Sequence, residues 1–387
     1  MEAIELLDII NAGETSKVQF KRELKLKQAA DIVAEMVAMS NYEGGIMLLG
    51  VENKSGNIVG LTFEEIESAN NYLFNWASNN IKPAIIIYTE TINTNNKNVL
   101  FITIPRGIDK PYCDNNMVYW IKSAANKRKV APSELKRLYQ SAGKLYAERQ
   151  NIENSSIDDV DFDLFKKFYS DRNKEDITKA DLKRIMQNLR LLENDKLTLA
   201  GAILFGNKNS VILPEFCISS VWFSGNDISV DIYKDSKNIS GNIYEQFKES
   251  SEFVLGKLKQ VQGDNSFNST GILEIPKIVF EEIIVNALVH RDYFINDSIK
   301  LFVFDNRIEI KSPGKLPNNM TINDVINGLQ RRTRNAVLTS LVNDIIPYKG
   351  IGSGVLRALK AYPHIKFENN IDAEYFKVTI YRPEEKA

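Results

Sequence analysis

Apolar residues recur along the first part of the chain in patterns that predict alternating helices and strands. Residues 28–39 have apolar side chains at helical spacing, and the glycines that follow suit a left-handed turn. Strands are predicted at 46–53 and 57–61. Thr62, with Glu65 three residues later, has the pattern of a capping box at the start of a second helix.

The same patterns continue to about residue 140. Residues 84–92 and 98–105 read as a hairpin around a polar loop, and 117–122 read as another strand. Pro132 suits the first turn of a short helix. We therefore expect one α+β domain at residues 1–140.

The remainder predicts two further parts. Residues 141–240 form a connector with two helical patterns and a strand at 216–223, and residues 241–387 form a third domain. Its predicted elements are helices at 242–261, from 276 and at 355–362, a hairpin of 298–305 with 307–314, and a strand at 375–383. The fold class expected is α+β, a mixed α/β multidomain protein whose last domain has two layers.

Composition narrows the functional classes. The chain has 387 residues with no apolar run near the ~20 that span a bilayer, and no signal peptide is recognisable. Two cysteines and two histidines are too few for a zinc cluster of CxxC type. A net charge of −1 argues against a general polyanion binder. We expect a cytoplasmic protein without membrane contact.

One helix carries a polar stripe. In residues 281–293, Glu282, Asn286 and His290 recur every four residues and share a face of an otherwise apolar helix. A buried polar network that fixes core packing is one interpretation. The other is a nucleotide site, in which Glu282 acts as general base and Asn286 holds Mg²⁺ with its carbonyl oxygen. Glu281, about 100° round the helix, is the weaker base candidate.

Two glycine-containing turns favour the nucleotide site. Gly350, Gly352 and Gly354 alternate directly before a helical pattern, where backbone N–H groups and the helix N-terminus suit a phosphate. Ser312 and Gly314 lie in a turn that ends a predicted strand.

The order of these motifs, E-x-x-x-N-A-L-x-H, S-P-G, R-N and G-x-G-S-G, resembles the GHKL (Bergerat-type) ATPase domain over about residues 272–387. The resemblance implies ATP and Mg²⁺ as cofactors, Glu282 as base and Asn286 as metal ligand. It also implies a cofactor site that includes Ser312, Gly314, Asn335 and the three glycines. Ser312 stands where the family places the aspartate that reads adenine.

The stretches "GETSKVQFKREL", "MSNYEGGIMLLGVEN" and "GNIVGL" resemble the Schlafen AlbA_2 domain, over about residues 10–140. Nuclease-active Schlafens cut RNA with three carboxylates and a divalent metal. The matching positions here are Glu14, Gln19 and Glu52, a degenerate trio because an amide cannot act as a base. We therefore expect no nuclease activity.

Basic residues cluster next to two aromatic ones. Lys122, Lys127, Arg128 and Lys129 follow Tyr119–Trp120. A solvated charged face is the plain interpretation. The resemblance favours contacts with the phosphates of DNA or RNA.

Together these expectations describe a protein that binds nucleic acid under the control of ATP, in transcriptional regulation or phage defence. We expect a homo-oligomer with at most weak ATPase activity. Two alternatives stay open: a Schlafen-like metal-dependent ribonuclease, and a non-catalytic scaffold that dimerises through a degenerate GHKL fold.

Overall fold

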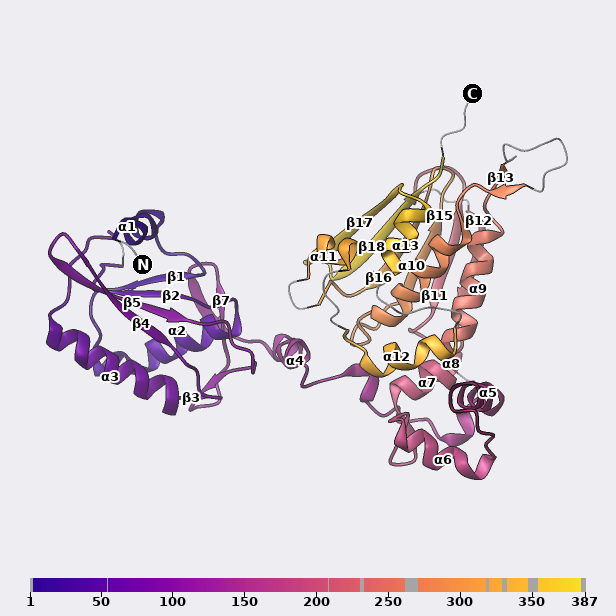
Figure 1. Ribbon diagram of the computed structural model, residues 1–387, viewed down its shortest axis with the longest axis horizontal. Helices are drawn as coiled ribbons and strands as arrows, with labels where there is room; N and C mark the ends of the chain where they lie inside the picture. Colours follow the sequence, from indigo (N-terminus) through magenta and orange to yellow (C-terminus); the bar gives the residue numbers. More distant parts are fainter. Residues whose placement is uncertain are drawn as a thin grey trace. The chain divides into compact units, whose positions relative to one another are not determined.

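The chain, shown in Figure 1 as a computed structural model, divides into two compact units, Met1–Leu145 and Tyr146–Ala387. The predicted domain boundaries at 140 and 240 remain predictions, although strands from both sides of residue 240 lie in one sheet. The structure describes residues 3–53, 55–207, 209–229, 233–261, 271–317, 320–328, 333–346 and 354–383.

The N-terminal unit is built on a four-stranded sheet in the order β1-β2-β5-β4. Strand β1 is parallel to β2, and the other pairs are antiparallel. The helices described are α1 (Ala3–Ala12), η1 (Leu26–Gln28), α2 (Ala29–Asn41), α3 (Phe63–Asn79) and α4 (Pro132–Ser141). The strands are β1 (Val18–Lys21), β2 (Gly45–Leu49), β3 (Ile81–Lys82), β4 (Tyr88–Thr94), β5 (Lys97–Ile104), β6 (Cys113–Asp114), β7 (Trp120–Ser123) and β8 (Asn126–Lys129).

Both faces of this sheet are covered. Successive side chains of a strand point to opposite faces, so Met47 and Leu49 of β2 pack with α2 and α3, while Leu48 packs with α1. The capping box predicted at α3 is present: Thr62 Oγ1 accepts the N–H of Glu65 at 3.2 Å, and the Glu65 carboxylate accepts the N–H of Thr62 at 2.8 Å. Local sequence signals were therefore reliable here.

The C-terminal unit is built on a six-stranded mixed sheet in the order β12-β11-β15-β16-β18-β17. Strand β11 is parallel to β15, and the other pairs are antiparallel. The strands described are β9 (Leu192–Glu193), β10 (Lys196–Leu197), β11 (Ile218–Phe223), β12 (Tyr233–Ile239), β13 (Gln260–Val261), β14 (Ile272–Leu273), β15 (Ile299–Val303), β16 (Arg307–Pro313), β17 (Ile365–Asn370) and β18 (Tyr375–Tyr381).

Helices α9, α10 and α13 lie together over this sheet, with α10 against β16 (Figure 1). Helix α9 ends near Gly256, earlier than predicted, and β13 follows it. The helices described are η2 (Ala147–Arg149), η3 (Ile157–Asp159), α5 (Phe162–Asn173), α6 (Lys179–Asn188), α7 (Leu199–Phe205), α8 (Asn209–Ile212), α9 (Ile243–Leu255), α10 (Lys277–His290), α11 (Ile322–Asn327), α12 (Ala336–Leu341), η4 (Val342–Asp344) and α13 (Gly354–Ala361).

Helix α10 is apolar around most of its circumference because neighbours cover it on several sides. It packs on β16 and on both α9 and α13. Its side chains Val279, Phe280, Ile283 and Leu288 are buried in the core of the unit. Of the polar stripe, Glu282 and Asn286 lie in this packed region, next to α13.

Candidate nucleotide site

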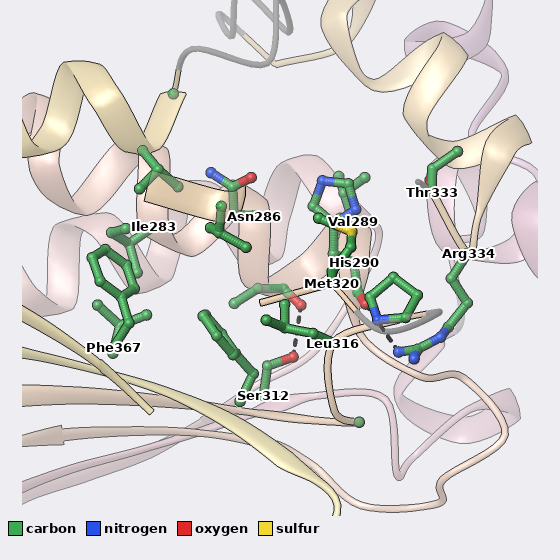
Figure 2. Close-up of a pocket in the computed structure, with 18 of the residues that line it drawn as sticks. Ile283, Asn286, Val289, His290, Ser312, Leu316, Met320, Thr333, Arg334 and Phe367 are labelled. Carbon is green, nitrogen blue, oxygen red and sulfur yellow. Dashed lines mark hydrogen bonds between the residues drawn. The ribbon is translucent and has the colours of Figure 1, made fainter. Parts of the chain in front are cut away.

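A cavity of about 390 Å³ lies between α10 and the sheet. Its size is that of an ordinary small-molecule pocket. Figure 2 shows Asn286 and His290 on the helical side, Ser312 on the sheet and Arg334 at one end. Four of the predicted cofactor residues line it: Asn286, Ser312, Gly314 and Gly354. Residues distant in sequence are thus brought to one cavity.

Glu282 is buried, with 4% of its surface exposed. One carboxylate oxygen, Oε1, pairs with Arg357 of α13 at 2.5 Å, and the other, Oε2, has no hydrogen-bond partner among the residues that the structure describes. Burial raises the pKa of Glu282, Arg357 opposes this, and the neighbouring Glu281 adds to the rise. A buried carboxylate oxygen without a partner is costly, so Oε2 is poised to accept a hydrogen bond from a water or ligand.

Asn286, one turn further along α10, presents its carbonyl oxygen away from the helix. Its Nδ2 donates to the main-chain oxygen of Glu282 at 2.6 Å. Because only the amide nitrogen can donate this bond, Oδ1 must point the other way. Amide oxygens are ligands that Mg²⁺ accepts. Asn286 therefore fits a metal-bound nucleotide in this cavity, with Glu282 one helical turn away.

Gly354, the first residue of α13, leaves room beside these two residues. A Cβ added there would lie 2.2 Å from Glu282 Oε2 and 3.4 Å from Asn286 Nδ2. Any larger residue would press directly on the carboxylate. Gly350 and Gly352, the other members of the predicted phosphate turn, lie outside the described residues.

The sheet side of the cavity holds Ser312 and Gly314. Ser312 Oγ donates to the main-chain oxygen of Ala287 at 3.0 Å, which leaves its lone pair as an acceptor. Gly314 has φ +102°, and a Cβ there would meet Asp292 Cβ at 2.5 Å and Arg334 Nη1 at 2.8 Å. The glycine is thus required by backbone conformation and by space.

Asn335 occupies a structural position. Its side chain is fully buried, and its Nδ2 donates to the main-chain oxygens of Val289 and Arg291 at 2.8 and 2.9 Å. The adjacent Arg334, which lines the cavity, donates to the Lys315 oxygen at 2.8 Å. The hydrogen bonds of Arg334 and Asn335 therefore stabilise the backbone at one end of the cavity. Arg334 lines the cavity, and Asn335 is not among its lining residues.

His290 completes the stripe at the end of α10 and lines the cavity. Enclosure by the surrounding protein and the nearby Arg334 cation lower the pKa of His290 to about 4. The imidazole is consequently neutral at pH 7.

One charged neighbour of Glu282, Arg357, was not recognised from the sequence. Arg357 lies 75 positions after its partner Glu282, so no local pattern connects the two. Glu281, the weaker base candidate, pairs with Lys277 at 2.8 Å. That contact leaves Glu282 as the carboxylate beside Asn286.

In the N-terminal unit, much of the predicted basic cluster is paired with acids. Lys122 is buried and contacts Glu35 of α2 at 2.6 Å. Lys127 contacts Asp31 at 2.6 Å and Glu35 at 3.2 Å. These lysines hold the β7–β8 hairpin against α2, and a phosphate would have to compete with the carboxylates for them.

The outer residues of that hairpin are more accessible. Arg128 is exposed and makes two contacts with Glu134, at 2.6 and 2.7 Å, which help lower the pKa of Glu134 to about 2. Lys129 is exposed and lies 5.9 Å from the ring centre of Trp120. Asp31 and Glu35 could have been suspected, because they stand four residues apart on a helix of mostly apolar residues.

The degenerate trio has its own local partners. Glu14 accepts the N–H of Phe20 at 2.9 Å, and Glu52 accepts the hydroxyl of Ser55 at 2.7 Å. Gln19 is buried, and its Nε2 donates to main-chain oxygens, most closely that of Ala125 at 2.8 Å. Among the described residues, no group of three or more His, Cys, Asp or Glu side chains is arranged to hold a metal.

Two family models match two separate stretches of the chain. Residues 14–131 match the family described as "Schlafen, AlbA_2". Residues 296–380 match the family described as "Putative ATP-dependent DNA helicase recG C-terminal", a range that includes Ser312, Gly314 and Gly354 but begins after α10. A search of curated proteins found no match.

Solved structures give two further similarities. A structural-genomics protein from Corynebacterium diphtheriae is 19% identical with a TM-score of 0.48, covering 98% of this chain and 80% of that one. The N-terminal domain of a putative ATP-dependent DNA helicase RecG-related protein from Nitrosomonas europaea is 21% identical with a TM-score of 0.25, covering 34% of this chain and 95% of that one. In the described part of the chain, no helix is long and apolar enough to cross a membrane. The predicted fold class is confirmed: the chain is a mixed α/β multidomain protein with an N-terminal AlbA_2 domain.

Proposed function

We propose that the C-terminal unit binds ATP with Mg²⁺ in the cavity between α10 and the sheet, in the manner of a GHKL domain. The observation that carries this proposal is the group formed by Asn286, Glu282 and Gly354. Asn286 and Gly354 line the cavity, and beside them lies a Glu282 oxygen that has no hydrogen-bond partner within the described part of the chain. The match to an ATPase-type domain supports the same conclusion.

The residues have separate roles in this proposal. Asn286 Oδ1 holds the metal, and Mg²⁺ neutralises phosphate charge when bound. Glu282 Oε2 accepts a proton from water in hydrolysis. Ser312, whose own proton is committed to Ala287, accepts a hydrogen bond from the base of the nucleotide. An acceptor at this position suits the amino group of adenine.

We further propose that the N-terminal unit binds nucleic acid, DNA or RNA, and that ATP controls this binding. The AlbA_2 match supports the association with nucleic acid. Arg128 and Lys129 are the exposed cations of the hairpin, beside Trp120, and carry the phosphate contacts. Lys122 is left out because its side chain is buried against Glu35. Transcriptional regulation or phage defence is the setting in which such control is useful.

The ribonuclease alternative gains no support from the geometry. Gln19 uses its amide to hold main-chain oxygens, and an amide cannot replace a catalytic carboxylate. The scaffold alternative differs in one measurable respect, because a degenerate domain that only dimerises does not bind ATP. The predicted homo-oligomer stays a prediction.

The control by nucleotide is tested with labelled DNA and RNA in fluorescence anisotropy, with and without ATP and Mg²⁺, at several salt concentrations. Lys129→Ala should flatten the slope of log K against log salt by about 0.9 for duplex DNA, the contribution of one phosphate contact. Lys82→Ala, an exposed lysine of β3, is the matched control. Equal slopes for both variants and the wild type, or an affinity that ATP does not change, would contradict the proposal.

A further inference from the structure

Arg357 contacts the candidate base from helix α13, whose first residue lines the cavity. It belongs to the first turn of α13, which begins at Gly354 beside Glu282 and Asn286. Its Nη2 reaches Glu282 Oε1 at 2.5 Å. The arginine side chain is 29% exposed, whereas the carboxylate side chain is only 6% exposed. The guanidinium is therefore held by Glu282 in a pair whose arginine is more accessible to solvent than its carboxylate.

We propose that Arg357 senses the terminal phosphate of ATP and that its pairing with Glu282 is the ligand-free arrangement of this sensor. The inference rests on the proposed function, because it concerns the same nucleotide site. It gives Arg357 two roles at that site. Arg357 distinguishes ATP from ADP, and it releases the base Glu282 when ATP is present.

The chemistry of the guanidinium suits this exchange. Arginine has five N–H donors in a planar fork and binds carboxylates and phosphates with the same geometry. A terminal phosphate near Asn286 and Gly354 would approach an arginine that already holds one anion. Because phosphate oxygens carry more charge than one carboxylate, they compete well for the donors that Glu282 uses.

Arg334, a cation that lines the cavity, is held in a way that makes this role harder for it. Arg334 donates to the main-chain oxygen of Lys315 and lies 3.9 Å from Asp292. These contacts fasten it to the end of the cavity near Gly314, on the sheet side. Arg357 instead pairs directly with the carboxylate that has to act on water.

This exchange couples recognition to activation. While Arg357 holds Oε1, Glu282 is tied to α13 and its freedom to orient a water is restricted. When a phosphate draws Arg357 away, Oε1 is released and both carboxylate oxygens can bind the attacking water. ADP lacks the terminal phosphate, so it leaves the Glu282–Arg357 pair intact.

The test is isothermal titration of ATP and of ADP, each with Mg²⁺, into the full chain. The wild type should bind ATP more tightly than ADP. Arg357→Gln should lower ATP affinity by about ten- to a hundredfold, the range for a lost hydrogen bond to a charged group. ADP affinity should stay within about twofold, and Arg357→Lys should lie between, since it keeps the charge without the fork.

Two variants separate this role from a structural one. Glu282→Gln removes the competing anion, so ATP should bind several-fold more tightly while ADP is unchanged. The double variant Glu282→Gln/Arg357→Gln leaves no unpaired buried charge and should bind ATP and ADP alike. Lys360→Gln, an exposed lysine on the same helix, is the matched control and should resemble the wild type.

The outcomes are distinct. If Arg357→Gln weakens ATP and ADP equally, or weakens neither, Arg357 is not a phosphate sensor, although the proposed function stands. If Glu282→Gln leaves the preference for ATP unchanged, the two side chains do not compete, and the exchange is refuted. If the wild type binds neither nucleotide, the proposed function fails and the inference fails with it.

Discussion

Gly354→Ala tests the packing beside Glu282 in the candidate nucleotide site without any ligand. The added methyl carbon would lie 2.2 Å from Glu282 Oε2, well inside contact distance. The carboxylate cannot easily retreat, because its other oxygen is paired with Arg357 at 2.5 Å. Overpacking of this kind costs about 1–3 kcal/mol. Replacing a glycine in a permitted backbone conformation returns about 0.5–1 kcal/mol. We expect a net destabilisation of about 1–2 kcal/mol.

The sign should reverse when the carboxylate is removed. In a Glu282→Ala background, the nearest remaining neighbour of the new methyl group is Asn286 Nδ2 at 3.4 Å, an ordinary contact. Gly354→Ala should then stabilise the protein by up to about 1 kcal/mol. The four proteins form a double-mutant cycle, measured by urea denaturation, with an expected coupling of about 2 kcal/mol. Equal effects of Gly354→Ala in both backgrounds would refute the close approach between Gly354 and Glu282.

Three further changes test other parts of the account. Glu282→Gln should lower any ATP hydrolysis by about 10²-fold, since it removes the general base, and unchanged turnover in a phosphate-release assay would remove Glu282 from that role. Glu35→Gln should destabilise the N-terminal unit by about 3 kcal/mol or more in urea denaturation, because buried Lys122 loses its counter-ion. Adding Lys122→Met to this variant should recover part of the lost stability. Burial, aided by the nearby Arg106, lowers the pKa of Lys110 to about 8, below the ~10.4 of an unfolded lysine. Between these two pH values the unfolded chain binds more protons than the folded chain. The free energy of unfolding therefore rises with pH in this range. The free-energy difference between wild type and Lys110→Met should consequently grow by about 2–3 kcal/mol in favour of the wild type from pH 7 to 11, and parallel pH curves would contradict the assignment.

Features that depend on neighbouring residues could be predicted from the sequence. The capping box of Thr62 and Glu65 follows from a spacing of three residues. The shared face of Glu282 and Asn286 follows from a spacing of four, and the structure places Asn286 in the lining of the cavity with Glu282 one helical turn away. Helical and strand periods gave most of the element types for the same reason, since each period is set by local backbone geometry.

Features that depend on distant residues could not be predicted. Lys122 was read as a surface cation because basic residues surround it, yet its partner Glu35 is 87 positions away. The Glu282–Arg357 pair is likewise long-range. Strand β12 lies at the edge of the large sheet with mostly exposed, polar side chains, so its sequence has no clear alternation to identify it. Asn335 was assigned to the cofactor from its motif, whereas its burial depends on α10, 44 or more residues earlier.

Calorimetric titration of ATP into the wild-type chain, with Mg²⁺ and then with EDTA, tests the central claim most directly, with Asn286→Ala as the companion variant. The account predicts that the wild type binds ATP about tenfold or more tightly with Mg²⁺ than without it, and that Asn286→Ala loses this difference. Asn286→Asp, which keeps an oxygen ligand, should retain it. No ATP binding by the wild type, or the same dependence on Mg²⁺ in Asn286→Ala, would contradict the assignment of this cavity as an ATP–Mg²⁺ site.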